Sequence, residues 1–194
     1  SGLVGSEMCI RDRFPSFSAG RVLDLGCGNA DVTLRFARAF PTTSITGVDA
    51  SQPMLDLAVS AVSEAGLQGR ITFMKRHLPD SVPASAPFDA VICNSLLHHL
   101  AAPSALWQTL TMTAKHGAPV LVMDLMRPAS RDAAEDLVQM HAADAHAILR
   151  RDFFNSLLAA YTPGEVAGQL AQAGLPFSVE TVSDRHMVVW GHVR

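Results

Sequence analysis

Four residues near the start of the chain have the types and spacing of a site for a nucleotide-type cofactor. Asp24, Gly26 and Gly28 lie where an apolar run, residues 21–25, gives way to a helical pattern. A strand that leads through a glycine turn into a helix N-terminus can hold such a cofactor against the backbone. Asp49 ends a second apolar run, 21 positions after Gly28. An acidic residue at about 20 positions beyond the glycines is placed to bind two ribose hydroxyls.

The class of cofactor depends on Asp31. The dinucleotide fingerprint requires a small residue at its third position, because helix and strand pack closely there, and this chain has Asp31. A carboxylate at this helix N-terminus suits the helix dipole but would repel a pyrophosphate. The sequence therefore favours S-adenosylmethionine, which has no phosphate, over NAD. Asp24 and Asp31 could instead be ordinary caps, and an NAD-dependent oxidoreductase is the alternative class.

The bulk composition is typical of one globular domain. The 194 residues are 48% hydrophobic and 17% charged, with a formal net charge of −3 and no basic run, so we expect no nucleic-acid partner. No apolar stretch approaches the roughly 20 residues that span a bilayer, so we expect no membrane partner. Three cysteines without CxxC spacing indicate a reducing, cytoplasmic location and no metal site. The oligomeric state is not indicated by the sequence.

The first thirteen residues differ from the rest of the chain. Residues 1–13 have no apolar periodicity, and Gly-Ser-Glu-Met-Cys-Ile-Arg-Asp-Arg within them looks like a translated sequencing adapter. We interpret residues 1–13 as a non-native leader, with a frayed N-terminus as the alternative. Residues 14–194 then form a single domain.

The elements that must position the candidate site alternate between strands and helices. Apolar runs rich in β-forming residues predict five strands, at residues 21–25, 44–48, 70–74, 88–93 and 119–125. Helical patterns between these runs predict helices at residues 30–40, 52–65 and 103–115. This alternation implies right-handed βαβ units and an open parallel sheet, with ligands at the carboxyl ends of its strands.

The pattern changes after Pro128. Residues 130–161 are mainly helical, and a capping box from Thr162 to Glu165 begins a further helix. Residues 177–182 and 186–190 alternate in polarity and predict a closing β-hairpin. The predicted fold is therefore a Rossmann-like, doubly wound α/β fold: a mainly parallel, seven-stranded sheet with a C-terminal antiparallel hairpin.

Three motifs in order resemble the class I S-adenosylmethionine-dependent methyltransferases. They are Asp-Leu-Gly-Cys-Gly after the first strand, Gly-Val-Asp-Ala-Ser after the second, and Phe-Asp-Ala-Val-Ile-Cys-Asn-Ser-Leu-Leu-His-His-Leu at the fourth. The resemblance covers about residues 18–128 and is similar to the small-molecule branch that includes ubiquinone and menaquinone biosynthesis enzymes. It implies methyl transfer from S-adenosylmethionine to a small organic acceptor, with S-adenosylhomocysteine as product.

The resemblance also implies roles for individual residues. Asp24, Gly26 and Gly28 would line the methionine end of the cofactor, and Asp49 would bind the ribose. The other implied cofactor residues are Ala50, Ser51 and Met54 beside the adenine, and Asn94 and Ser95 beside the sulfonium.

The adenine end departs from the family pattern. Where the family usually has Gly-Asp-Ala, with the acid bound to the adenine amino group, this chain has Arg76, His77 and Leu78. A neutral His77 could accept that hydrogen bond, with Leu78 beside it. Asp80 is a possible substitute.

Two adjacent histidines are the candidates for catalysis. His98 and His99 lie just beyond the fourth strand, at the ligand-binding edge. A histidine there titrates in the range that a general base needs. Adjacent helical residues point about 100° apart, so we expect one of the two to face the cleft. A structural, hydrogen-bonded histidine is the alternative for the pair.

Substrate residues are expected around the helical block, which lies where this family inserts a substrate cover, at about residues 130–161. The candidates are His99, Arg127, Arg150 and Tyr161; Arg127 could bind an anionic substrate or cap a loop. An alternative function is S-adenosylmethionine binding without turnover, because the native N-terminal segment, which often closes over the cofactor in this family, is interpreted as missing.

Overall fold

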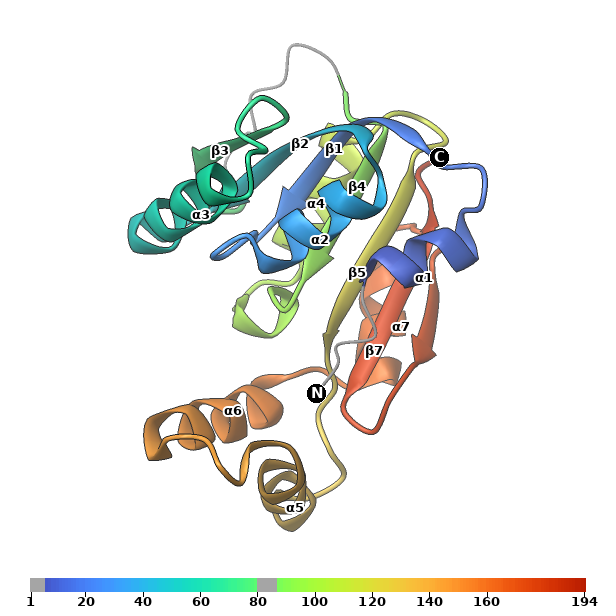
Figure 1. The fold of residues 1–194 in the computed structure, drawn as a ribbon. Helices are drawn as coiled ribbons and strands as arrows, with labels where there is room; N and C mark the ends of the chain where they lie inside the picture. The colour runs from blue at the N-terminus through green and yellow to red at the C-terminus, as the bar shows by residue number, and fades with distance from the viewer. Residues whose placement is uncertain (1–5, 80–86) are drawn as a thin grey trace.

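The computed structural model describes residues 6–79 and 87–194, which form an α/β fold around one sheet (Figure 1). In these residues the strands are β1 (Ala19–Leu25), β2 (Thr42–Asp49), β3 (Ile71–Lys75), β4 (Ala90–Asn94), β5 (Pro119–Leu125), β6 (Ser178–Thr181) and β7 (His186–His192). Their order is β3-β2-β1-β4-β5-β7-β6. Strands β1 to β5 are parallel, and β7 is antiparallel to both β5 and β6. The predicted seven-stranded fold with its C-terminal hairpin is therefore confirmed.

The strand register explains why residues far apart in sequence meet at one edge. Leu25 at the end of β1 is paired with Val48 of β2 on one side and with Cys93 of β4 on the other. The residues that follow these three are Gly26, Asp49 and Asn94. Because β1 to β5 are parallel, their carboxyl ends lie together. The strand order also reverses at β1 and β4, which is where open α/β sheets bind ligands.

Apart from α1 and η1, which were not predicted, the helices match the predicted pattern, with ends that differ by a few residues. They are α1 (Ser6–Arg13), α2 (Asp31–Ala39), α3 (Gln52–Glu64), α4 (Ser104–Thr113), α5 (Arg131–Ala142), α6 (Ala147–Ala159) and α7 (Pro163–Gln172), with a short 3-10 helix, η1 (Leu97–His99). Ser51 caps α3, and the capping box at Thr162 and Glu165 is present at α7. Along the described ranges, none of these helices is both long and apolar enough to cross a membrane.

Helices cover both faces of the sheet (Figure 1). Successive strand residues point to opposite faces, so Val22 packs with α2 and α3 residues such as Phe36 and Val62, whereas Leu23 packs with α4 residues such as Trp107. Both strand residues are fully buried. This double burial is why the parallel strands are apolar throughout rather than alternating.

Residues 6–13 form α1, which contacts α2. Ile10 on this helix is fully buried in the cluster that contains Phe36, and the Arg13 guanidinium lies 2.5 Å from a Glu180 carboxylate oxygen on β6. Arg11 also donates a hydrogen bond to the carbonyl of Ala39 and lies over the Phe40 ring. Among residues 10–13, whose side chains the structure describes, one isoleucine and two arginines thus anchor a segment without apolar periodicity. Its non-native origin stays a prediction.

Helices α5 and α6 form a hairpin that stands apart from the sheet (Figure 1). The hairpin has its own small apolar cluster, in which Ala134, Leu137 and Val138 of α5 meet Leu157 of α6. The imidazole of His141, on α5, lies 2.6 Å from the carboxylate of Asp184, which is in the turn between β6 and β7. The hairpin occupies the position expected for a substrate cover, and its role as a cover stays a prediction.

Candidate functional site

A cavity of about 520 Å³ lies at the edge where β1, β2 and β4 end. Its walls come from the glycine turn after β1, the β2–α3 connection and the β4–η1 connection. The residues that line it are Asp24, Gly26, Cys27, Gly28, Asn29, Asp31, Val32, Asp49, Ser51, Met54, Asn94, Ser95, Leu96 and His99. Eight of the residues predicted to bind the cofactor, together with His99, are therefore brought to one cavity.

The glycine turn needs glycine for two different reasons. Gly26 and Gly28 have φ of +72° and +53°, which residues other than glycine rarely adopt. A Cβ at Gly26 would also lie 2.9 Å from the Cβ of Leu96, so the loop after β4 packs directly on this backbone. A Cβ at Gly28 would meet nothing within 4 Å. The missing side chain at Gly26 thus lets Leu96 pack against the turn, whereas the missing side chain at Gly28 leaves open space.

The Asp49 carboxylate joins the two loops that hold the cavity. Its Oδ2 accepts a hydrogen bond from the backbone N–H of Gly28 at 2.9 Å, and its Oδ1 accepts one from the N–H of Ser51 at 2.8 Å. A carboxylate oxygen has two lone pairs, so each oxygen can accept a further bond. Asp49 is therefore held in place and still able to accept hydroxyl donors.

Asp24 lies at the base of the cavity and is almost fully buried. Burial raises the pKa of its carboxyl to about 6; the hydrogen bond that Thr33 Oγ1 donates at 2.5 Å acts against this, and the charge of Asp49 adds to it. A buried carboxylate is stabilised by a nearby cation. Burial, with the charges of Asp24 and Asp49, also raises the pKa of Cys27, so this thiol is a neutral wall group and not a nucleophile.

The cavity is acidic. Asp24, Asp31 and Asp49 line it, and among the described lining residues there is no lysine or arginine. Asp31 accepts a hydrogen bond from Arg35 at 2.7 Å, one turn along α2. The side-chain oxygen of Asn94 is buried without a hydrogen-bond partner in the described part of the chain. These acceptor groups suit a ligand that carries positive charge and N–H or O–H donors, and they would repel a pyrophosphate.

The two adjacent histidines have different surroundings, although their ring centroids are 4.0 Å apart. His99 lines the cavity, whereas the His98 imidazole turns inward, with Nδ1 2.6 Å from Oδ1 of the buried Asp124. Asp124 Oδ2 also accepts a hydrogen bond from the N–H of Leu97. His98 therefore ties η1 to the end of β5. Burial, and next the neighbouring His98, lowers the pKa of His99, so its imidazole is neutral at pH 7.

Three predicted cofactor residues do not line the cavity. Ala50 and His77 are exposed, and Leu78 packs against the main core cluster. Asp80 lies outside the described residues. At the adenine end the structure thus brings Ser51 and Met54 to the cavity, but not the residues that replace the family's Gly-Asp-Ala.

The predicted substrate residues other than His99 are placed elsewhere. Arg127 forms an ion pair with Glu165, and Tyr161 Oη donates a hydrogen bond to the carbonyl of Leu100 at 3.0 Å. Arg150 lies in the α5–α6 hairpin, where it donates to Gln139. Their roles toward a substrate stay predictions.

Besides Asp31, which the sequence analysis weighs as a helix cap, four lining residues are not predicted as ligands from the sequence. They are Cys27, Asn29, Val32 and Leu96. Three of them belong to the glycine turn or the first turn of α2, so proximity to the motif was the available signal. Leu96 reaches the cavity because Ser95 has a φ of +55°, which turns the chain after β4; the sequence carries no sign of this.

Comparison with known proteins finds a family match over the part of the chain that forms the cofactor cavity. A family model described as "Methyltransferase domain" matches residues 22–117, about half of the chain and all of the cavity residues. The chain is 32% identical over 110 residues to a ubiquinone/menaquinone biosynthesis C-methyltransferase of Syntrophotalea carbinolica; this match covers 57% of the chain and 46% of that protein.

Two other relatives differ in what their names say they act on. Identity is 27% over 182 residues to a 27-O-demethylrifamycin SV methyltransferase of Amycolatopsis mediterranei, covering 91% of the chain and 61% of the relative. Identity is 35% over 88 residues to a ribosomal protein uL3 glutamine methyltransferase of Bordetella pertussis, a match that covers 45% of the chain and 29% of the relative. The matches thus span less than two thirds of each of these relatives.

Solved structures share the fold at low sequence identity. An S-adenosylmethionine-dependent methyltransferase from Aquifex aeolicus has a TM-score of 0.74 and 17% identity, covering 98% of this chain and 91% of that one. The plantazolicin methyltransferase BpumL, in a complex with S-adenosylhomocysteine, has a TM-score of 0.75 and 14% identity, covering 97% and 82%.

Proposed function

Because the chain belongs to the class I S-adenosylmethionine-dependent methyltransferases, we propose that it transfers a methyl group from this cofactor to a small organic acceptor. The observation that carries the proposal is the acidic cavity at the ends of β1, β2 and β4. Its glycine turn and its Asp49 carboxylate can hold the cofactor, and the neutral histidine on its wall can serve an acceptor that loses a proton.

The residues of the cavity fit the cofactor. S-adenosylmethionine carries two positive groups, a sulfonium and an ammonium, which complement the buried Asp24 and the charge of Asp49. We assign Asp24 to the ammonium and Asp49 to the ribose hydroxyls, and we assign Ser51 and Met54 to the border of the adenine. Asn94 offers its unpartnered oxygen at the reacting end.

The chain itself contributes alignment and exclusion of water. The bound cofactor supplies an activated methyl group on sulfur, and displacement at that carbon requires the acceptor to approach in line. The glycine turn and Asp49 hold the cofactor side rigidly, since both Asp49 oxygens are bonded to backbone N–H groups. Leu96 and Val32 add apolar wall that keeps water away from the reacting end.

His99 is our candidate for the general base. Its imidazole is neutral at pH 7, so a ring nitrogen can accept the proton that an oxygen or nitrogen acceptor loses on methylation. His98 is bonded to Asp124 and is not available for the same task. A carbon acceptor that is already nucleophilic would not require His99, so the effect of its removal distinguishes these acceptor classes.

A small acceptor is supported by two observations. Two of the matched relatives are named for small-molecule chemistry, and the rifamycin relative aligns with 91% of this chain. The formal net charge of −3 and the acidic cavity disfavour a nucleic acid. The α5–α6 hairpin then serves as the cover on the acceptor side.

Turnover with a panel of acceptors tests this proposal. Transfer of a radiolabelled methyl group from S-adenosylmethionine would be followed into phenols, catechols, carboxylic acids and small amines, with total ribosomal protein as the competing class of acceptor. We expect label transfer to at least one small acceptor. Label transfer to ribosomal protein alone would contradict the small-acceptor proposal, and cofactor binding without any transfer would support the alternative of a binding protein.

A further inference from the structure

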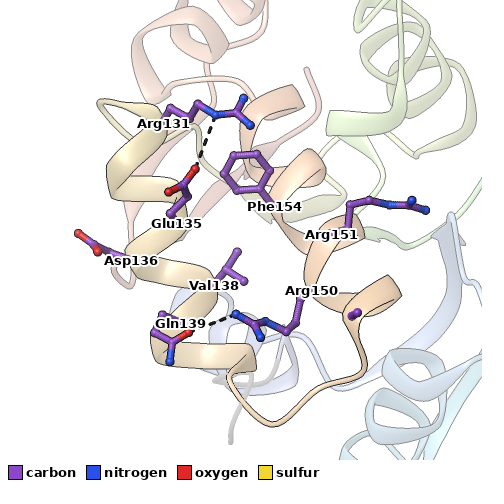
Figure 2. Close-up of a pocket in the computed structure, with 9 residues that line it drawn as sticks. Arg131, Glu135, Asp136, Val138, Gln139, Arg150, Arg151 and Phe154 are labelled. Atoms are coloured by element: carbon purple, nitrogen blue, oxygen red, sulfur yellow. Dashed lines mark hydrogen bonds and ion pairs between the residues drawn. The ribbon is translucent and has the colours of Figure 1, made fainter.

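A second cavity, of about 620 Å³, lies in the groove between α5 and α6 (Figure 2). The residues that line it are Arg131, Glu135, Asp136, Val138, Gln139, Ala147, Arg150, Arg151 and Phe154. None of them lines the cofactor cavity. Its volume is in the range of small-molecule sites, which is about 300–1,000 Å³.

The floor of this groove is apolar. Val138 of α5 and Phe154 of α6 point toward each other from the facing helices (Figure 2). The Arg131 guanidinium lies over the Phe154 ring, 4.6 Å from its centroid. At the other end of the groove, Arg150 Nη2 donates to the side-chain oxygen of Gln139 at 3.2 Å. An apolar floor with a cation at either end would hold an amphipathic anion.

The groove arginines lack close carboxylate partners. The nearest carboxylate oxygen to Arg131 is that of Glu135 at 3.7 Å, and the nearest to Arg151 is that of Asp152 at 3.9 Å. Among the described residues no ion pair is formed by Arg150.

Basic residues elsewhere are paired more tightly. Arg13, Arg35 and Lys115 each lie within 2.7 Å of a carboxylate oxygen. The donors that Arg131 and Arg150 direct into the groove are thus available to an added anion, and a guanidinium can bind such an anion through two parallel hydrogen bonds.

The acidic residues of the groove do not cancel this charge. Asp136 points away from α6 in Figure 2, and Glu135 lies on the same helix as Arg131, one turn along. Against Glu135 stand the two guanidiniums of Arg131 and Arg150, whereas Arg151, like Asp136, points away from the groove in Figure 2. The groove is therefore positive on balance, in contrast to the acidic cofactor cavity.

We propose that the α5–α6 groove is a second ligand site, which binds a small anion with an apolar or aromatic body. Its carboxylate, sulfonate or phosphate group pairs with Arg131 and Arg150, and its apolar body lies on Val138 and Phe154. The site is separate from the cofactor cavity, so the inference does not depend on the methyl transfer proposed above.

The fluorescent anion 1-anilinonaphthalene-8-sulfonate tests this site, and N-phenyl-1-naphthylamine, which has the same aryl groups without the sulfonate, is its neutral partner. Both are titrated into the whole protein with S-adenosylhomocysteine in excess, so that the cofactor cavity is filled. The test variant is Arg131→Gln with Arg150→Gln. The control is Arg38→Gln with Arg194→Gln, which removes two charges from exposed residues elsewhere.

We expect the groove variant to bind the sulfonate about tenfold more weakly than the wild type and the control. The affinity for the neutral amine should stay within about twofold in all three proteins, which also shows that the variant is folded. Equal sulfonate affinity in the groove variant and the control would overturn the proposal. A parallel loss of both probes would overturn it too, because the guanidiniums would then not select an anion.

Discussion

The cofactor cavity and the α5–α6 groove are built from different parts of the chain. The shape of the cofactor cavity is set largely by backbone: two glycines at positive φ, and two N–H groups bonded to Asp49. The α5–α6 groove is formed by side chains that two helices direct toward each other, with Arg150 bonded to Gln139 and Arg131 over Phe154. A wall made of backbone admits few residue types, whereas a wall of side chains tolerates many. The first kind therefore leaves a motif in the sequence and the second does not.

Among variants of the cofactor cavity, removal of the His99 imidazole should have the largest effect on turnover. His99→Asn should lower kcat by about 100-fold or more for an oxygen or nitrogen acceptor, the usual contribution of a general base, and should leave S-adenosylhomocysteine affinity within a few-fold. Steady-state kinetics with calorimetry would measure both. An unchanged kcat would mean that the acceptor needs no base from this residue.

A comparison of two glycines tests whether the wall depends on close packing. Gly26 and Gly66 both have positive φ, but a Cβ at Gly26 would lie 2.9 Å from Leu96, whereas a Cβ at Gly66 meets nothing within 4 Å. Gly66→Ala should cost about 1 kcal/mol for its backbone conformation alone. Gly26→Ala should cost about 2–3 kcal/mol, since overpacking is added. Urea unfolding of both variants would measure the difference, and equal losses would show that Leu96 moves aside.

The buried Asp24 predicts a pH dependence of cofactor affinity. Because burial raises its pKa to about 6, Asp24 is increasingly protonated below pH 6 and loses its attraction for the cofactor ammonium. Affinity for S-adenosylhomocysteine should fall by about tenfold per pH unit below that value. Asp24→Asn should bind S-adenosylhomocysteine more weakly at every pH, and its affinity should not fall further below pH 6. A wild-type affinity that is flat between pH 5 and 7 would argue against the contact.

The same shift has a consequence for folding in the absence of ligand. The folded pKa of Asp24 is raised above the ordinary 3.8, so its stabilising contribution is fully present below pH 3.8 and is lost as pH rises through about 6. In Asp24→Asn the free energy of unfolding should lose this pH dependence. Urea unfolding between pH 4 and 7 would show whether the two proteins diverge in that window.

The smallest effect is expected where the hairpin meets the sheet. The hydrogen bond from His141, and less so from Arg185, lowers the pKa of Asp184, so the pair stabilises at neutral pH and its contribution is lost as pH falls through that lowered value. The pair is partly exposed, so a double-mutant cycle of His141→Ala and Asp184→Ala should give a coupling below about 1 kcal/mol. A larger coupling would show that the hairpin is held as firmly as the cofactor cavity.

Much of the fold could be predicted from the sequence, because patterns of burial decide it. The doubly buried strands are continuous apolar runs, and the capping box at Thr162 marks the start of α7. Helix α1 is the exception: of its described side chains, those of residues 10–13, Ile10 is buried and two arginines make contacts, and no periodic apolar face marks the helix in the sequence.

The candidate site could be predicted only where backbone geometry dictates the residue. Gly26, Gly28 and Asp49 follow from the turn and its spacing. The separate directions of His98 and His99 could not be derived, because they depend on Asp124, which is 26 positions beyond His98 in the chain and reaches it only through the β4–β5 pairing. Ala50, His77 and Leu78 were expected at the adenine end, but the structure does not bring them to the cavity.

Calorimetry with S-adenosylmethionine is the most direct test of the central claim, that the acidic cavity binds this cofactor through Asp49. Asp49→Ala should weaken binding by about 100-fold or more, because it removes the ribose acceptor and frees two N–H groups that shape the cavity. Asp56→Asn, at an exposed carboxylate on α3, is the matched control and should bind as the wild type does. Unchanged affinity in Asp49→Ala, or displacement of the cofactor by NAD, would contradict the account.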